Sequence, residues 1–247
     1  MGLATLLLAL LLPGLCSSLS DFTSSRTTFY GSPECQGNPH GACGYGEFGK
    51  VMNGGDVGAV GKLYRGGSGC GACYQIKCTH PELCKEEGVG IVVTDHGYSG
   101  DADFVLSAQG FAKLSRPNMA PQLMAYGGID IQYRRVPCKY PGYNLTIKIK
   151  EQSSYPHYLA FVFIHQGGQK DILAVEVWQE DCKQWRPMRR AYGGVFDVEN
   201  PPEGPLPLRL QVRGEDGGEQ SSWVQLNNVI PADWKAGAAY DTAVQLS

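Results

Sequence analysis

The chain has 247 residues, a formal net charge of −3 and a pI near 6.0. This balance argues against a nucleic-acid-binding protein, which normally presents a strongly basic face. The 33 glycines and 15 prolines, with few stretches of helical periodicity, favour an all-β protein with many turns.

The N-terminal segment is typical of a secretory signal peptide. A leucine-rich run is followed by Pro13-Gly14 and then by small residues. The run is shorter than the roughly 20 residues needed to span a bilayer, and no later stretch is long and apolar enough. We therefore expect residues 1–20 to be removed and the mature protein to be secreted, leaving about 227 residues.

Secretion changes how the cysteines are interpreted. Four of them lie between residues 70 and 84, and the CxxC spacing at the start of this cluster would also suit a zinc site or a redox pair. Disulfides persist in an oxidising compartment, and we expect them here. Cys16 leaves with the signal, so eight of the nine cysteines remain, with about a hundred possible pairings. Seven of these eight precede residue 139, and this asymmetry indicates two domains.

The first half of the mature chain predicts a small, disulfide-linked barrel. Residues 27–65 are rich in glycine and aromatic residues, which favours loops with short strands. Strand signals follow at residues 72–78, 88–96 and 127–138, and the first and third alternate apolar and polar residues as half-buried strands do. Only residues 107–114 have a helical pattern.

The second half predicts a β-sandwich. From residue 143 onward cysteine nearly disappears, and seven short strand-like segments recur with turns between them. The segment before them, Lys139 to Gly142, is short and contains a proline, so we expect the two domains to sit close together. The predicted organisation is a signal peptide at 1–20, a barrel at 21–139, a linker at 140–142, a sandwich at 143–240 and a tail at 241–247.

Eight segments spread over nearly the whole mature chain carry a resemblance to a known family. In the first half these are TFYG at 28–31, GACGYG at 41–46, GCGACYQIKC at 69–78, VTD at 93–95 and QYRRVPCKYPG at 132–142. In the second half they are YLAFVF at 158–163, YGGVF at 192–196 and VIPADWKAG at 229–237. Together and in this order they resemble the expansin superfamily of plant cell-wall proteins, specifically its expansin-like B group.

The resemblance implies an all-β fold: a six-stranded double-psi β-barrel followed by an immunoglobulin-like, carbohydrate-binding β-sandwich. It also implies the disulfides Cys43–Cys70, Cys73–Cys138 and Cys78–Cys84. Cys35 and Cys182 are left over. They either bridge the two domains or remain free thiols, since their proximity cannot be read from the sequence.

The expansin barrel is similar to that of family-45 endoglucanases, which raises the question of hydrolysis. An inverting glycosidase needs two carboxyl groups, roughly 6.5–9.5 Å apart. The family's general-acid position corresponds to Val105 here, and a second acidic position of beta-type expansins corresponds to Asn38. Neither side chain can donate or take up a proton as an acid or base at neutral pH. Asp95 remains as one cleft carboxylate. Asp101 and Asp103 lie nearby and are interpreted as turn residues.

We therefore expect a non-hydrolytic protein with no catalytic residue, no cofactor and no metal. Its expected function is to bind wall polysaccharide across both domains and to loosen glucan contacts. Two alternatives stay open. One is a residual glycoside hydrolase that uses Asp95 with Asp101 or Asp103, and the other is a carbohydrate-binding protein without loosening activity.

Aromatic rings are the expected sugar-binding groups, because a flat ring matches the apolar C–H face of a sugar and excludes water. The resemblance implies a binding surface formed by Thr28, Phe29, Tyr30, Asp95, Tyr158 and Tyr192. The alternative interpretation is that these rings belong to the core, above all the ring that begins the apolar run at 158–163. The four tryptophans are interpreted as core or edge packing: Trp178, Trp185, Trp223 and Trp234.

A mildly acidic protein suits a neutral glucan, such as cellulose or xyloglucan, better than it suits polyanionic pectin. The Arg134-Arg135 pair lies in an alternating strand, leaves one side chain exposed and does not form a polyanion patch. We expect no nucleic-acid or membrane partner, and a monomer. The sequon that begins at Asn144 predicts a glycan there.

Overall fold

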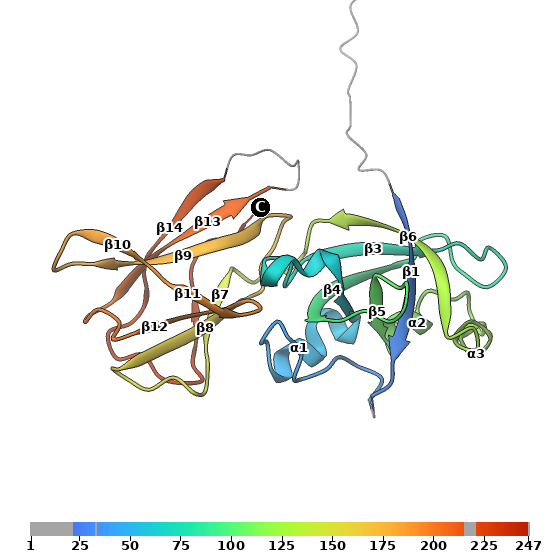
Figure 1. Ribbon diagram of the computed structural model, residues 1–247, viewed down its shortest axis with the longest axis horizontal. Coiled ribbons are helices and arrows are strands. Elements are labelled where there is room, and N and C mark those ends of the chain that lie inside the picture. Colours follow the sequence, from blue (N-terminus) through green and yellow to red (C-terminus); the bar gives the residue numbers. More distant parts are fainter. Residues whose placement is uncertain (1–21, 33, 215–220, 247) are drawn as a thin grey trace, which may run out of the picture.

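The computed structural model describes residues 22–32, 34–214 and 221–246, and it places two β-rich units side by side (Figure 1). The predicted signal peptide at 1–20 lies outside the described residues. Within those residues, none of the helices has the length and apolar character needed to cross a membrane.

The first unit is a closed barrel with the strand order β1-β5-β2-β4-β3-β6. It combines parallel pairing, β1 with β5 and β2 with β4, with antiparallel pairing between its other neighbours. The predicted six-stranded barrel is confirmed. Its strands are β1 (Thr23–Tyr30), β2 (Val57–Val60), β3 (Cys73–Cys78), β4 (Val89–His96), β5 (Phe104–Ser107) and β6 (Gly128–Val136).

Short helical segments connect the barrel strands. They are α1 (Glu47–Val51), η1 (Met52–Gly55), η2 (Lys62–Gly67), α2 (Ala108–Ala112) and α3 (Ala120–Met124). The helix α2 lies within the segment predicted to be helical, and the hydroxyl of Ser107 caps it by accepting a hydrogen bond from the Gly110 N–H at 3.1 Å. The sequence does not reveal α1 and α3, because five residues are too few to show a helical period.

The second unit is a β-sandwich of a four-stranded sheet, β10-β9-β13-β14, and a five-stranded sheet, β11-β12-β8-β7-β15. Inward-facing alternate residues fill its core; in β13 these are Leu206, Leu208, Leu210 and Val212. Its strands are β7 (Thr146–Ile149), β8 (Tyr158–Ile164), β9 (Asp171–Gln179), β10 (Gln184–Pro187), β11 (Arg189–Tyr192), β12 (Val195–Glu199), β13 (Leu206–Arg213), β14 (Ser222–Ile230) and β15 (Ala239–Asp241).

One of the seven strand-like segments after residue 143, at residues 185–191, forms parts of two strands, β10 and β11. The chain passes from one sheet to the other at Met188, so that β10 joins the four-stranded sheet and β11 the five-stranded sheet. The Met188 side chain is buried, and its N–H donates to the carbonyl oxygen of Val175 at 2.9 Å. Periodicity alone does not show such a crossing, because both halves keep an extended backbone.

The two units share a hydrophobic core where they meet. In β8, alternate residues face the interior of the sandwich, while the residues between them face the barrel. The barrel-facing residues belong to the same cluster as the Cys43–Cys70 disulfide: Ala160, Val162 and Ile164, with Val195 of β12. Because both faces of β8 are buried, the sequence at 158–163 is continuously apolar instead of alternating between apolar and polar residues.

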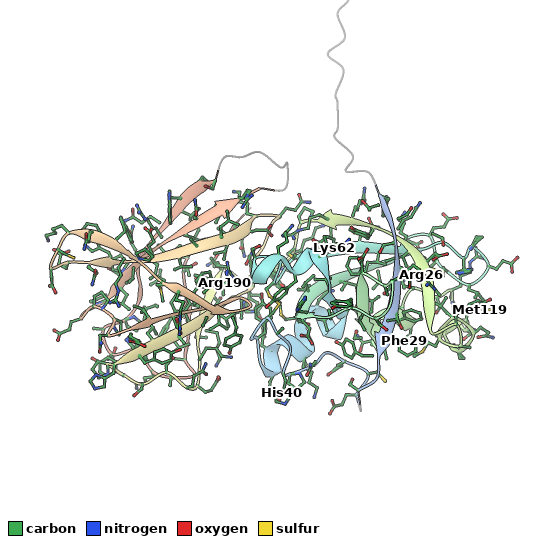
Figure 2. All side chains as sticks on the ribbon, in the orientation of Figure 1. Arg26, Phe29, His40, Lys62, Met119 and Arg190 are labelled. Atoms are coloured by element: carbon green, nitrogen blue, oxygen red, sulfur yellow. A yellow bond between two sulfur atoms is a disulfide. The ribbon has the colours of Figure 1, made fainter. Side chains whose placement is uncertain are left out.

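The backbones approach so closely at this seam that glycine is required. A Cβ on Gly67 would lie 2.1 Å from the carbonyl oxygen of Gly193, and a Cβ on Gly193 would lie 2.1 Å from that of Ala42. Both glycines also have positive φ, 98° and 48°. Arg190, labelled near the seam in Figure 2, donates to the Gly193 carbonyl at 2.8 Å. The YGGVF segment therefore packs directly on the loop that carries Cys43.

Polar contacts also join the units. The Asp171 carboxylate of β9 pairs with Arg65 of η2 at 2.5 Å and with Arg135 of β6 at 3.2 Å. Backbone hydrogen bonds of 2.9 and 3.0 Å connect Cys138 with Gly168. The chain is therefore already bonded to the sandwich at Cys138, before the predicted linker at 140–142 begins.

All three disulfides implied by the resemblance are present: Cys43–Cys70, Cys73–Cys138 and Cys78–Cys84, with Cα–Cα distances of 5.5, 5.3 and 5.8 Å. Cys35 and Cys182 are exposed free thiols. The structure thus decides between the two open alternatives, and no disulfide between this pair bridges the units.

The shared core predicts that both units unfold together. Val162 is 1% exposed, so Val162→Asp buries an unpaired carboxylate at the seam and should cost about 4 kcal/mol or more. Differential scanning calorimetry should show one transition for the native protein and two separated transitions for the variant. The matched control is Val51→Asp, because that valine is 49% exposed. A single transition at the native temperature in Val162→Asp would contradict the shared core.

Candidate functional site

A groove of about 520 Å³ opens on the barrel beside the ends of β1 and β4. Its lining includes Tyr30, Asn38, Asp95 and Val105. A second hollow of about 500 Å³ adjoins it and is lined by Lys62, Asp101 and Asp103, among others. His96 and Tyr98 line both hollows, so the two lie side by side.

Asp95 is held in one orientation by the loop that precedes α1. Its Oδ1 accepts hydrogen bonds from the backbone N–H groups of Ala42 at 2.6 Å and His96 at 2.8 Å. Its Oδ2 accepts from the side-chain amide of Asn38 at 3.1 Å. The carboxylate thus serves as a fixed acceptor at the base of the groove.

Tyr30 supplies a hydrogen-bond donor beside this acceptor. Burial, and then the neighbouring Asp95 carboxylate, raise the pKa of Tyr30 to about 12. The hydroxyl therefore keeps its proton at any physiological pH. The hydroxyl oxygen is buried beside Asn38 and Asp95, while the Tyr30 side chain contributes to the lining of the groove.

The other two barrel residues predicted for the site are placed differently. Phe29 points to the opposite face of β1 from Tyr30, and its ring lies 4.7 Å from the ring of Phe111 in α2. Thr28 is opposite Val105 in the β1–β5 pairing, and its hydroxyl donates to the Gly127 carbonyl at 2.6 Å. Figure 2 shows Phe29 near the lower end of β1.

Tyr192 extends the site onto the sandwich. Its side chain is 46% exposed, and its ring lies against Gly44, where an added Cβ would be 2.8 Å from the ring carbon Cε2. Gly44 is two residues, at most about 7 Å, beyond Ala42, whose N–H binds Asp95. The partly exposed Tyr192 ring therefore lies close to the Asp95 end of the groove.

Tyr158 is positioned by an ion pair that the sequence does not reveal. Its hydroxyl donates to Asp197 at 2.8 Å, and Arg189 binds the same carboxylate through two nitrogens at 2.6 and 2.9 Å. The Arg189 guanidinium holds the pKa of Asp197 below its ordinary value, whereas burial and then the bond to Asp197 raise the pKa of Tyr158. A charged residue inside the apolar VFDV strand is the signal that could have revealed this cluster.

The tryptophans lie away from the groove. Trp234 is 3% exposed and belongs to the sandwich core. The other three are on the four-stranded sheet: Trp178 and Trp185 are half-buried with ring centroids 5.3 Å apart, and Trp223 is 43% exposed. They do not line the groove.

Two further predicted features can be placed. The side-chain amide of Asn144 is half-buried and donates to Asp241 at 3.0 Å, and a glycan there stays a prediction. Over the described part of the chain, no cluster of three or more His, Cys, Asp or Glu side chains has the arrangement of a metal site.

Sequence comparisons bear directly on this arrangement. Residues 145–231 match the family model of the expansin C-terminal domain, and residues 57–133 match a model described as lytic transglycolase. The chain is 52% identical to Expansin-like B1 of Arabidopsis thaliana over 96% of this chain and 94% of that protein. The chain belongs to the expansin superfamily.

Another relative agrees with the predicted expansin-like B group. Expansin-like B1 of Oryza sativa subsp. japonica is 40% identical over 92% of this chain and 89% of that protein. The apo expansin of Clavibacter michiganensis superposes with a TM-score of 0.66 at 23% identity, covering 91% of this chain and 98% of that one. An aspartate-to-asparagine variant of the same protein, solved in complex with cellohexaose, gives 0.67 at 22% identity with the same coverage. At this identity the likeness establishes the fold.

The Arg189–Asp197 pair predicts a pH-dependent contribution to stability. The pKa of Asp197 is lower in the folded state than its ordinary value of 3.8, which applies to the unfolded chain. Its carboxylate therefore stabilises the fold at pH values above 3.8, and this contribution disappears as the pH falls through the folded-state pKa. Asp197→Asn should lower the free energy of unfolding by about 2 kcal/mol at pH 7, and the deficit should shrink below pH ~4. Urea denaturation across pH measures it. Asp233→Asn, an exposed control on the same unit, should show no deficit. A deficit that is independent of pH would contradict the ion pair.

Proposed function

We propose that this protein is a secreted, extracellular, non-hydrolytic wall protein that binds a neutral glucan along the surface from the barrel groove to Tyr192 and Tyr158. The bound polysaccharide is cellulose or xyloglucan, and binding loosens contacts between glucan chains. The cellohexaose complex of a relative with the same fold supports a glucan ligand. Three disulfides suit an extracellular protein.

The observation that carries the non-hydrolytic assignment is the lining of the groove. Asp95 lies at its base with all of its described hydrogen bonds accepted from N–H groups, and the family's general-acid position is occupied by Val105. An inverting reaction needs a second carboxyl group that carries a proton. Neither Val105 nor the Asn38 amide can deliver one at neutral pH.

The hydrolytic alternative would use Asp101 or Asp103 from the adjoining hollow. Arg26 binds Asp101 at 2.7 Å, and this bond lowers the pKa of Asp101, whereas a general acid needs a raised pKa. Asp103 accepts a hydrogen bond from the Ser25 hydroxyl at 2.8 Å. Both residues are thus engaged with β1, which favours a structural role for them.

Loosening without cleavage follows from the chemistry of such a surface. An exposed ring at Tyr192 offers a face for the C–H groups of a sugar. In the groove, the Tyr30 side chain adds aromatic surface, and Asp95 retains oxygen lone pairs that can accept a hydrogen bond from a sugar hydroxyl. These contacts offset the hydrogen bonds that a glucan chain loses when it separates from its neighbours.

The aromatic surface is tested by retention on insoluble cellulose. Removing an exposed stacking ring should weaken binding about tenfold, so we expect Tyr192→Ala to bind about tenfold more weakly than the native protein. Tyr126→Ala is the matched control, because that tyrosine is 59% exposed, packs beside His80 and is not among the residues that line the groove. Unchanged binding by Tyr192→Ala, or equal losses in both variants, would contradict the proposed surface.

The non-hydrolytic assignment is tested by incubating purified protein with soluble glucan and counting reducing ends. We expect no increase over buffer, while strips of isolated cell wall extend under load. New chain ends that disappear in Asp95→Asn would establish the hydrolase instead. Retention on cellulose without any wall extension would establish the carbohydrate-binding protein that lacks loosening activity.

A further inference from the structure

A further pocket, of about 360 Å³, lies at the seam and is lined by arginines from both units. Arg65 comes from η2, Arg134 and Arg135 from β6, and Arg213 from the end of β13. Asp171 is the acidic residue that lines it among the described residues. The two consecutive arginines of β6, which form no anion patch by themselves, are thus completed by arginines distant in the sequence.

This seam pocket is separate from the groove. Thr23, the first residue of β1, lines the seam pocket, whereas Tyr30, the last, lines the groove. Figure 1 shows β1 running from the upper to the lower side of the barrel. A strand of this length spans about 23 Å, so the two sites are too far apart to hold the same sugar ring.

Arg135 presents an unpaired donor at this pocket. Its side chain is 6% exposed and lies over the ring of Tyr74, with the guanidinium carbon 5.4 Å from the ring centroid. One terminal nitrogen binds Asp171 at 3.2 Å, but the Nε atom is buried and has no hydrogen-bond partner among the described residues. A buried donor without a partner is unfavourable, so the described partners of Arg135 leave part of the donor capacity of its guanidinium unused.

Positive charge is in excess around this donor. Asp171 is shared between Arg65 and Arg135, so one carboxylate faces two guanidinium groups. Arg134 makes contacts with neutral groups, donating to the Gln75 side chain at 2.9 Å and lying 4.8 Å from the Phe22 ring. Arg213 is exposed and forms no ion pair with the described residues.

We propose that the seam pocket binds a carboxylated sugar, such as a uronate residue of an acidic polysaccharide. A planar guanidinium matches a carboxylate through two parallel hydrogen bonds, which suits this lining. The pocket volume falls within the range typical of small-molecule sites, roughly 300–1,000 Å³, and Tyr74 and Tyr133 add aromatic surface beside the charges. This site is independent of the neutral-glucan surface and holds whether or not that surface binds cellulose.

Isothermal titration of the mature protein with trigalacturonate tests the proposal. The double variant Arg134→Gln/Arg213→Gln removes two accessible charges and leaves the buried Arg135 in place. We expect it to bind at least tenfold more weakly, with an unchanged melting temperature. Arg116→Gln, an exposed arginine outside the pocket, is the matched control and should bind like the native protein. Raising the salt concentration should weaken binding.

Competition experiments separate the remaining outcomes. Saturating cellohexaose should not displace trigalacturonate, because the two sites are distinct. Displacement would place the acidic sugar in the groove and overturn the proposal. Inorganic phosphate that binds as tightly as trigalacturonate would reduce the pocket to a general oxyanion site and overturn the sugar assignment. No binding of trigalacturonate, or equal binding by the double variant, would also overturn it.

Discussion

The close backbone packing between the two units is the constraint on which the rest of the structure depends. Gly67 and Gly193 lie so close to the opposing backbone that any side chain would collide with it. This contact lets the barrel-facing side of β8 pack against the Cys43–Cys70 disulfide and join the barrel core. Two domains that would otherwise be joined only by a short linker become one body with a fixed geometry.

Both candidate binding sites follow from that geometry. The loop from Ala42 to Gly44 bonds to Asp95 on one side and contacts the Tyr192 ring on the other, so it fixes the position of the groove relative to that ring. On the other side of the barrel, the same packing brings Arg65 and Arg135 to a carboxylate of the sandwich. The seam pocket is lined by residues of both units, whereas the groove is lined by barrel residues, so the interface sets the geometry of the pocket and the position of the groove relative to Tyr192.

The sequence predicts the all-β class, the two-part organisation and, through the resemblance, the disulfide pairs. Through the resemblance it also places Tyr30 and Asp95 in the candidate site, and both residues line the groove. Consecutive residues of a strand point to opposite faces, so the sequence could have shown that Phe29 faces away from Tyr30. The resemblance assigned both residues to the binding surface together because they belong to the same TFYG motif. The seam pocket could not be predicted, because Arg65 and Arg213 meet only through the packing of the two units.

The most direct test of the continuous glucan surface is NMR of labelled protein titrated with cellohexaose. The account predicts that backbone amides of both units shift together along one binding curve: those around Asn38 and His96 in the barrel and those around Tyr192 in the sandwich. Shifts confined to one unit, or two curves with different affinities, would contradict a single surface built across the seam.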